Sequence, residues 1–297
     1  MNYNYLRIFY TVAKLQNISK AAEQLEVTQP AVSRIISSIE KEYKVKLFSR
    51  SKNGVKLTPE GQKLFEMIKS PCNELERIDE SITNGELFKD SFIHIGATTT
   101  ALYCFLFKIL EKIKAQFPSI NFRIYSDSSG NLLKMVLDGA VDFAFITTPF
   151  AKNDEIVIDS FYELNNVLIA PISYKDKIKG PVSIKSLVKY PFILLNKEMQ
   201  FREYINEFLK QHNAIIHPAY ETDSSSELLP FVKNDYGLTF IPEEMAEEAI
   251  NEGKCFKVDL MEKMPVRHIS CIAKKERNKS SVIYEIMDEI LKLKNIL

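Results

Sequence analysis

Apolar residues in the first 45 positions recur every three or four residues, which is the period of an amphipathic helix. Residues 3–15 carry one such stripe and predict a first helix. Residues 19–25 predict a second helix with Ser19 as its N-cap, because serine oxygen accepts hydrogen bonds from free N–H groups. Ala21 and Ala22 on this helix are small enough to let another helix cross closely. The pattern therefore predicts two helices that pack against each other.

A third helix is predicted after a short turn, with Thr28 as its N-cap and Pro30 in its first turn, where a missing N–H costs nothing. Its buried face is expected to consist of Val32, Ile36, Ile39 and Tyr43. Gln29, Ser33 and Ser37 share the outward face, with Pro30 and Arg34 beside them. The chain then enters residues 45–58, where Asn53-Gly54 between β-prone residues predicts a hairpin.

The segment after the hairpin has the pattern of one long helix. Thr58, Pro59 and Glu60 predict its start. Apolar residues and one proline then follow spacings of four and three, which is typical of a coiled-coil seam and implies a partner helix. The seam consists of Leu64, Ile68, Pro71, Leu75, Ile78 and Ile82. Pro71 is expected to kink the helix. The alternative is that the stripe packs on the chain's own core.

From residue 92 the pattern changes to apolar strands alternating with helices, which predicts an α/β domain with a parallel sheet covered on both faces. We expect three parts of the chain: a helical unit with a hairpin at 1–58, a linker helix at 59–89 and an α/β domain at 90–297. The α/β domain divides into two lobes. Lobe 1 is expected at about 90–160 and 266–297, and lobe 2 at about 161–265. The strands are expected at 92–97, 121–126, 141–149, 166–173, 192–196, 217–223, 237–242 and 268–274.

Composition adds a charge asymmetry to this layout. The 297 residues balance 39 basic against 39 acidic side chains. Residues 1–63, however, hold 11 basic and 5 acidic side chains, a net charge of +6, whereas residues 64–90 hold 3 and 7, a net charge of −4. A positive potential that a phosphate backbone attracts is thus confined to the N-terminal fifth.

The sequence gives little support for a membrane, secreted or metal-binding protein. No run approaches the ~20 apolar residues of a membrane helix, and no signal peptide is evident, so a cytoplasmic protein is expected. The cysteines are far apart and are expected to be reduced and structural, with neither a metal site nor a cofactor implied. They are Cys72, Cys104, Cys255 and Cys271. His94 and His268 stand alone in predicted strands.

The stretch FYTVAKLQNISKAAEQLEVTQPAVSRIISSIEKEYKVKLFSRSKNGVKLTPEGQKL closely resembles the N-terminal region of LysR-type transcriptional regulators. ETDSSSELLPFVKNDYGLTFIPEEM resembles the second lobe of that family more loosely. The resemblance implies α/β architecture with an N-terminal all-α winged helix-turn-helix, a long linker helix that dimerises, and a two-lobed effector domain like periplasmic binding proteins. It also implies a homo-oligomer, namely a homotetramer built as a dimer of dimers. RNA polymerase is a further candidate partner.

For double-stranded operator or promoter DNA, the third helix is expected to enter the major groove. Gln29, Ser33 and Arg34 can reach base edges or phosphates, and Pro30 can contact a thymine methyl. The resemblance places Arg50 and Lys52 of the wing on the DNA backbone. Ile35, Ser37 and Ser38 stand where many members of the family have glutamine and basic residues, so we expect affinity to depend on the wing and on having several reading heads.

A small effector, an anion such as a carboxylate, is expected between the lobes. Thr98, Thr99 and Thr100 close the first strand and open a helix, which turns hydroxyl and N–H groups toward the crevice. Thr147 and Thr148 end the third strand, and Arg202 begins a helix of lobe 2 near the same crevice. For each threonine a capping or strand-end role is the alternative, and for Arg202 a surface position.

The residues leave three interpretations open. The first is an effector-responsive DNA-binding regulator. The second is a solute-binding module without gene control, which residues 1–60 disfavour. The third is an enzyme acting on a small carboxylate in the cleft, for which no nucleophile and base stand out. We expect the first, and no enzymatic activity.

Overall fold

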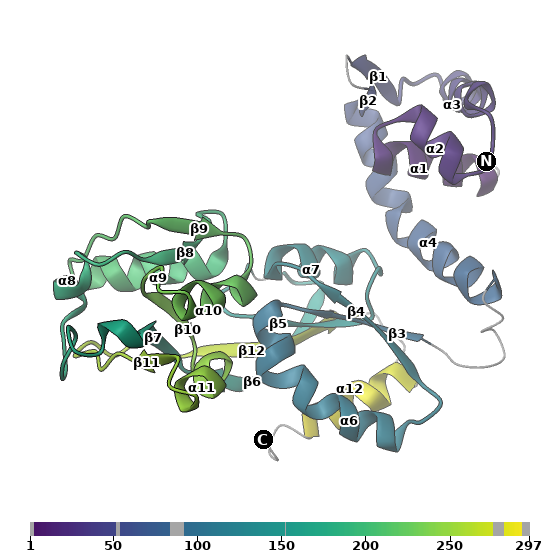
Figure 1. Ribbon diagram of the computed structural model, residues 1–297. Helices are drawn as coiled ribbons and strands as arrows, with labels where there is room; N and C mark the ends of the chain where they lie inside the picture. Colours follow the sequence, from purple (N-terminus) through teal and green to yellow (C-terminus); the bar gives the residue numbers. More distant parts are fainter. Residues whose placement is uncertain (1–2, 52–53, 84–91, 152, 276–281, 293–297) are drawn as a thin grey trace. The chain divides into compact units, whose positions relative to one another are not determined.

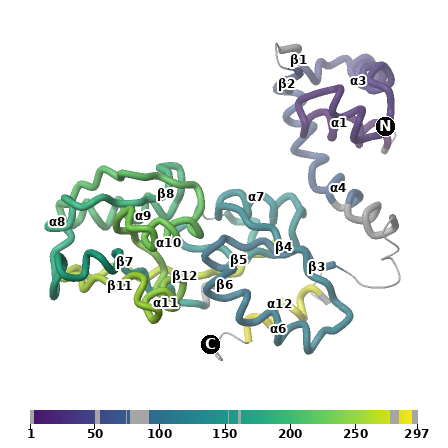
Figure 2. The backbone as a smooth tube through the Cα atoms, viewed as in Figure 1, coloured from purple at the N-terminus to yellow at the C-terminus, as the bar shows by residue number. Residues whose placement is uncertain are grey.

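The computed structural model describes residues 3–51, 54–83, 92–151, 153–275 and 282–292 (Figures 1 and 2). The chain divides into two compact units, namely residues 1–89 with 138–140, and residues 90–137 with 141–297. Among the described helices none is both long and apolar enough to cross a bilayer.

The N-terminal unit is a helical bundle followed by a hairpin and a long helix. Its core consists of residues from all the helices, including Phe9, Ala21, Val32 and Ile39, which are inaccessible to solvent or nearly so. Ala21 and Ala22 are both buried, as predicted for a close helix crossing. The elements are α1 (Tyr3–Leu15), α2 (Ile18–Gln24), α3 (Gln29–Tyr43), β1 (Phe48–Ser51), β2 (Gly54–Leu57) and α4 (Pro59–Thr83).

Details at the ends of these helices differ from expectation. Asn17, not Ser19, caps α2, and its Oδ1 accepts a hydrogen bond from the Lys20 N–H. Thr28 occupies the N-cap position of α3, but its side chain makes no capping hydrogen bond. The prediction of a buried Tyr43 is wrong, since this side chain is 45% exposed. The helix ends there, and its last turn reaches past the core.

The hairpin after α3 is the predicted wing. Strands β1 and β2 pair antiparallel from Phe48↔Leu57 to Ser51↔Gly54. Gly54 adopts φ +135°, and a Cβ there would lie 2.4 Å from the Gln16 carbonyl oxygen, so only glycine fits. Thr58 then caps α4 as expected, because its Oγ1 accepts a hydrogen bond from the Gly61 N–H.

Helix α4 begins as part of the N-terminal core. Ile68 is buried there and Leu64 packs against it, so the first half of the predicted seam contacts the chain's own core. Pro71 lies within the helix, which continues through it to Thr83. Leu75 is half-buried. The side chains of Ile78 and Ile82 lie outside the described residues.

Lobe 1 of the C-terminal unit is a sheet in the order β4-β3-β5-β12-β6, with helices on both faces (Figure 1). Strand β3 is parallel to β4 and β5, whereas β12 is antiparallel to β5 and β6. The prediction of a purely parallel sheet is therefore wrong, and strand β6 was missed because its apolar Val157 and Ile158 face solvent at the sheet edge. The elements are β3 (Phe92–Ala97), α5 (Thr99–Ala101), the π-helical turn Leu102–Leu106, α6 (Phe107–Gln116), β4 (Asn121–Ser126), α7 (Ser129–Leu137), β5 (Phe143–Thr147), β6 (Ile156–Leu164), β12 (Arg267–Lys274) and α12 (Val282–Lys292).

Lobe 2 is built around β7, which pairs antiparallel with β10 and β11. Strands β8 and β9 pair with each other in parallel, and a bridge from Phe192 to Leu238 joins them to the region of β10. Apolar clusters on the two sides of these strands contain residues of α8 and α9, and of α10 and α11. The elements are β7 (Asn166–Pro171), the 3-10 turn Ile172–Tyr174, α8 (Ile184–Leu187), β8 (Ile193–Leu195), α9 (Gln200–Gln211), β9 (Tyr220–Thr222), α10 (Ser225–Lys233), β10 (Thr239–Pro242), α11 (Glu243–Asn251) and β11 (Cys255–Lys257).

The chain passes between the lobes through β6 into β7 and returns along β12 (Figure 2). All four cysteines are buried, and none of them forms a disulfide in the structure. Within the described ranges, no three His, Cys, Asp or Glu side chains are grouped as metal ligands would be.

Candidate DNA-reading helix and effector cavity

The N-terminal turns of α3 present the predicted DNA-reading side chains to solvent. Gln29, Pro30 and Arg34 are exposed, and Ser33 is half-buried. Val32, Ile36 and Ile39 of the same helix are buried in the bundle core, which fixes the direction in which the exposed face points. Of the predicted wing contacts, the Arg50 side chain and the whole of Lys52 lie outside the described residues.

Glu40 fastens the end of α3 to the wing. Its carboxylate accepts hydrogen bonds from the Leu47 N–H (2.8 Å), the Phe48 N–H (3.3 Å) and Lys46 Nζ (2.7 Å). Partial burial alone raises the pKa of Glu40, but the bonds from Lys46, Leu47 and Phe48 outweigh it and lower the pKa overall. The ionised Glu40 therefore helps to hold the wing against the reading helix, beside the packing of Phe48 and Val55 on the core.

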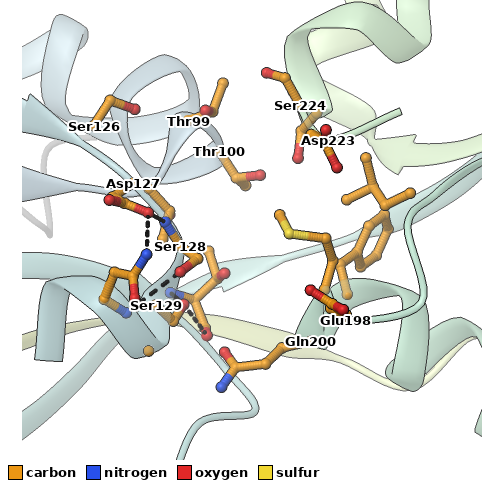
Figure 3. Close-up of a pocket in the computed structure, with 18 of the residues that line it drawn as sticks. Thr99, Thr100, Ser126, Asp127, Ser128, Ser129, Glu198, Gln200, Asp223 and Ser224 are labelled. Carbon is orange, nitrogen blue, oxygen red and sulfur yellow. Dashed lines mark hydrogen bonds between the residues drawn. The ribbon is translucent and has the colours of Figure 1, made fainter. Parts of the chain in front are cut away.

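A cavity of about 630 Å³ lies between the two lobes of the C-terminal unit. Lobe 1 lines it at the carboxyl ends of β3, β4 and β5, and lobe 2 at the loops that follow β8 and β9 (Figure 3). Its volume lies in the range of small-molecule sites. The lining residues are Thr98–Thr100, Ser126–Asn131, Thr147, Leu195, Glu198–Phe201, Asp223–Ser225 and Arg267.

Arg267, at the start of β12, is the cationic side chain in this lining. It is 3% exposed, its Nε donates to the Thr148 carbonyl oxygen (2.7 Å), and its guanidinium stands 4.5 Å from the Phe201 ring centre and 5.3 Å from that of Tyr204. Burial lowers the pKa of Arg267 from 12.5 to about 10, so it stays charged at neutral pH. No carboxylate of the described residues comes within 4.0 Å of it.

A buried charge without a counter-ion is costly, and an anion that enters the cavity recovers part of that cost. The guanidinium fork matches the two oxygens of a carboxylate. Hydroxyl groups of Thr99, Thr100 and Ser128 lie on the lobe 1 side (Figure 3). The arrangement can therefore hold a small carboxylate.

The structure brings the predicted Thr98, Thr99, Thr100 and Thr147 into the cavity lining. Thr98 also caps the following helix, because its Oγ1 accepts from the Ala101 N–H (3.2 Å). The capping role considered as the alternative for Thr98 is thus present, and the residue lines the cavity as well.

The expectations for Arg202 and Thr148 need correction. Arg202 is not part of the cavity lining. Its Nη1 donates to the Leu195 carbonyl oxygen (2.7 Å) and to Glu221 Oε1 (2.6 Å), which turns the guanidinium into lobe 2. Thr148 is outside the lining too. Its Oγ1 accepts a hydrogen bond from the His268 N–H (2.8 Å). Thr148 instead holds Arg267 in place through its carbonyl oxygen.

Sequence reasoning missed Arg267, Glu198, Asp223 and Ser129. Ser129 begins α7, and its hydroxyl donates to the Thr147 carbonyl oxygen (3.1 Å) and accepts from the Thr147 N–H (3.3 Å), which joins the helix to the end of β5. Arg267 directly precedes the strand predicted at 268–274, and nothing local distinguished it from a surface arginine. Its role arises from the antiparallel pairing that inserts β12 beside β5.

Comparison with known families finds matches for two parts of the chain. Residues 3–62 match the model of the bacterial regulatory helix-turn-helix protein of the lysR family, and residues 91–294 match that of the LysR substrate binding domain. The chain belongs to the LysR family of transcriptional regulators. The fold predicted from the resemblance is thereby confirmed.

Full-length relatives of this LysR regulator include "HTH-type transcriptional regulator TdcA" of Escherichia coli K12, 26% identical over 96% of this chain and 92% of that protein. CzcR of Bacillus subtilis is 24% identical over 98% of this chain and 97% of that regulator. Among solved structures, CbnR complexed with its target DNA has a TM-score of 0.71 and 19% identity, covering 99% of this chain and 100% of that chain. At this identity the likeness to CbnR establishes the fold.

Proposed function

We propose that this LysR regulator binds double-stranded operator or promoter DNA as a homo-oligomer, a dimer of dimers, and responds to a small anionic effector in the interlobe cavity. DNA inside the cell is its target, so the protein acts in the cytoplasm. The observation that carries the effector part is Arg267, a buried guanidinium that lines the cavity and has no carboxylate partner among the described residues. CbnR, a structural neighbour, has been solved with its target DNA, which supports the DNA part.

At the DNA, Gln29, Ser33 and Arg34 contact base edges in the major groove, and Pro30 contacts a thymine methyl group. The exposure of Gln29, Pro30 and Arg34 at the start of α3 supports this role. Arg50 and Lys52 of the wing contact the DNA backbone and supply affinity for any sequence.

Effector binding changes the closure of the two lobes, and the change reaches the reading heads through the linker helices. Thr98, Thr99, Thr100 and Thr147 contribute polar contacts from lobe 1, and Arg267 takes the place that the sequence suggested for Arg202. RNA polymerase is a candidate partner of the DNA-bound oligomer.

Arg34 provides the test of the DNA-reading role. Arg34→Ala is expected to weaken operator binding by about 1–3 kcal/mol and to relax sequence preference, because a bidentate contact with guanine is lost. Lys52→Ala is expected to weaken binding to all DNA sequences alike. The measurement is gel-shift and footprinting on DNA beside the protein's own coding region.

Lys41→Ala is the matched control, since this exposed lysine lies in the last turn of the same helix, away from the proposed groove contact. An unchanged footprint and affinity for Arg34→Ala would remove Arg34 from the interface. Loss of binding by Lys41→Ala to the same extent would indicate that only net charge matters.

A further inference from the structure

The cavity that holds Arg267 is also lined by carboxylates. Asp127 comes from lobe 1, and Glu198 and Asp223 come from lobe 2 (Figure 3). A ligand with negative charge alone would be attracted by Arg267 but repelled by these groups. The lining therefore contains carboxylates that could bind a positively charged group, which a simple anion does not have.

The carboxylates differ in how far the protein already satisfies them. Asp127 Oδ1 accepts from the Ser128 N–H (2.6 Å) and from Asn131 Nδ2 (2.9 Å), as in a local turn. Asp223 Oδ1 accepts from Asn196 Nδ2. Glu198 makes no hydrogen bond or ion pair with any described residue, so its carboxylate is available to a ligand.

The fold places Glu198 and Asp223 at one edge of lobe 2. Strands β8 and β9 are parallel and in register at Leu195↔Thr222, and the Asn196 N–H donates to the Thr222 carbonyl oxygen (2.9 Å). Glu198 follows the end of β8 by three residues and Asp223 follows β9 directly. The loops that carry both acids are thus held together at the carboxyl ends of the strands, where open α/β sheets bind ligands.

Opposite charges share this cavity without pairing. The guanidinium of Arg267 is more than 4.0 Å from every carboxylate of the described residues, including Glu198 and Asp223. A ligand between them gives the buried Arg267 a counter-ion, and its other charge meets the solvent-exposed, unpaired carboxylate of Glu198.

We propose that the effector is a zwitterion of the amino acid class. Its carboxylate binds Arg267, and its ammonium group binds Glu198, with Asp223 as the neighbouring acid. This inference rests on the proposed function, because it specifies the ligand of the same cavity. Recognition of both charges at once disfavours dicarboxylates that lack an amino group, because they would bring a second negative charge to Glu198.

The test uses the full-length protein and matched pairs of compounds. Each of the protein amino acids is paired with the acid that lacks its amino group, for example L-valine with 3-methylbutanoate and L-aspartate with succinate. Binding is measured by thermal unfolding and calorimetry, since a ligand that binds the folded state raises the unfolding midpoint. We expect one or a few amino acids to bind at least about tenfold more tightly than their deaminated partners.

Glu198→Gln is expected to weaken binding of the amino acid roughly tenfold, because the ammonium contact is lost. The affinity for its deaminated partner should stay the same or rise slightly. Asp223→Asn should act in the same direction with a smaller effect. Glu203→Gln is the control, since this acid is exposed on α9 of the same lobe and does not line the cavity.

Equal or tighter binding of deaminated acids, or unchanged amino acid affinity in Glu198→Gln, would overturn the zwitterion and leave the proposed anionic effector standing. If no compound of either class shifts the midpoint, the zwitterion and the carboxylate effector both fail. The gel-shift experiment tests DNA binding independently of these ligand measurements.

Discussion

At the scale of single residues, two buried arginines have opposite roles. Arg202 is 5% exposed and is paired with Glu221 and the Leu195 carbonyl oxygen inside lobe 2. Arg267 is equally buried but has no carboxylate partner among the described residues, and it lines the cavity. Their side-chain chemistry is the same, so the environment alone makes one structural and the other available to a ligand.

This difference predicts distinct effects of the same substitution. Arg202→Met leaves Glu221 and a buried carbonyl oxygen unpaired and should cost about 1–3 kcal/mol of stability. Arg267→Met also loses a hydrogen bond, to the Thr148 carbonyl oxygen, but it removes a buried charge that has no carboxylate partner among the described residues. Since methionine keeps apolar contact with Phe201, we expect a smaller loss of stability, within about 1 kcal/mol, together with loss of ligand binding. Urea unfolding and calorimetry of both variants measure this.

The reverse pattern would contradict the assignment. Strong destabilisation by Arg267→Met with intact ligand binding would make Arg267 the structural arginine of the pair. Arg267→Lys is a useful companion variant, because it keeps the charge but loses the planar fork and its stacking on the Phe201 ring.

At the scale of elements, one carboxylate of the reading helix contributes to the attachment of the wing. The pKa of Glu40 is lower in the folded protein than its ordinary value of 4.5, so the ionised form stabilises the fold above that pH. The stabilisation disappears as the pH falls through the folded-state pKa. Acidification below about pH 4.5 should therefore weaken the attachment of the wing to α3.

Glu40→Gln tests this linkage. At pH 7 the variant should lose about 1–2 kcal/mol of stability in the N-terminal unit, because charge-assisted bonds to Leu47, Phe48 and Lys46 are weakened. The difference from the unmodified protein should shrink as the pH is lowered below 4.5. Unfolding monitored across pH measures it, with Glu23→Gln, an exposed acid of α2, as the control. A difference that is independent of pH would contradict the role of ionisation.

Most elements were predictable, and the failures have a common cause. The predicted ranges 3–15, 92–97 and 121–126 match α1, β3 and β4 as the structure has them. Strands β6 and β11 were missed, since β6 exposes apolar residues at a sheet edge and β11 has only three residues. Both owe their conformation to partner strands, which local patterns do not contain.

At the scale of the whole molecule, the seam of α4 divides into two parts at Pro71. Ile68 is buried in the core of the N-terminal unit, as the alternative interpretation of the seam required. Leu75 lies a further two turns along and is half-buried. If the protein forms the homo-oligomer proposed above, we expect the seam beyond Pro71 to be the part that pairs with a second chain.

Substitutions along α4 should distinguish the part of the seam in the N-terminal core from the part beyond Pro71. Ile68→Asp is expected to unfold the N-terminal unit, at a cost of about 3 kcal/mol or more, because it buries a charge. The double variant Leu75→Asp, Ile78→Asp should leave that unit folded and lower the oligomeric state. Circular dichroism and sedimentation measure the two effects. Unchanged sedimentation of the double variant would exclude the second half of the seam as the pairing surface.

The sequence by itself determined the order of the domains, the helices of the DNA-reading unit and the outward face of Gln29, Ser33 and Arg34, because helical periodicity and capping are local. It also placed Thr98, Thr99, Thr100 and Thr147 at strand ends facing a crevice. Only the tertiary structure decided which charged residues meet there. Arg267, Glu198 and Asp223 are distant in sequence and converge through strand pairing, and Arg202 finds its partners inside lobe 2, because long-range contacts and burial set the surroundings of each charge.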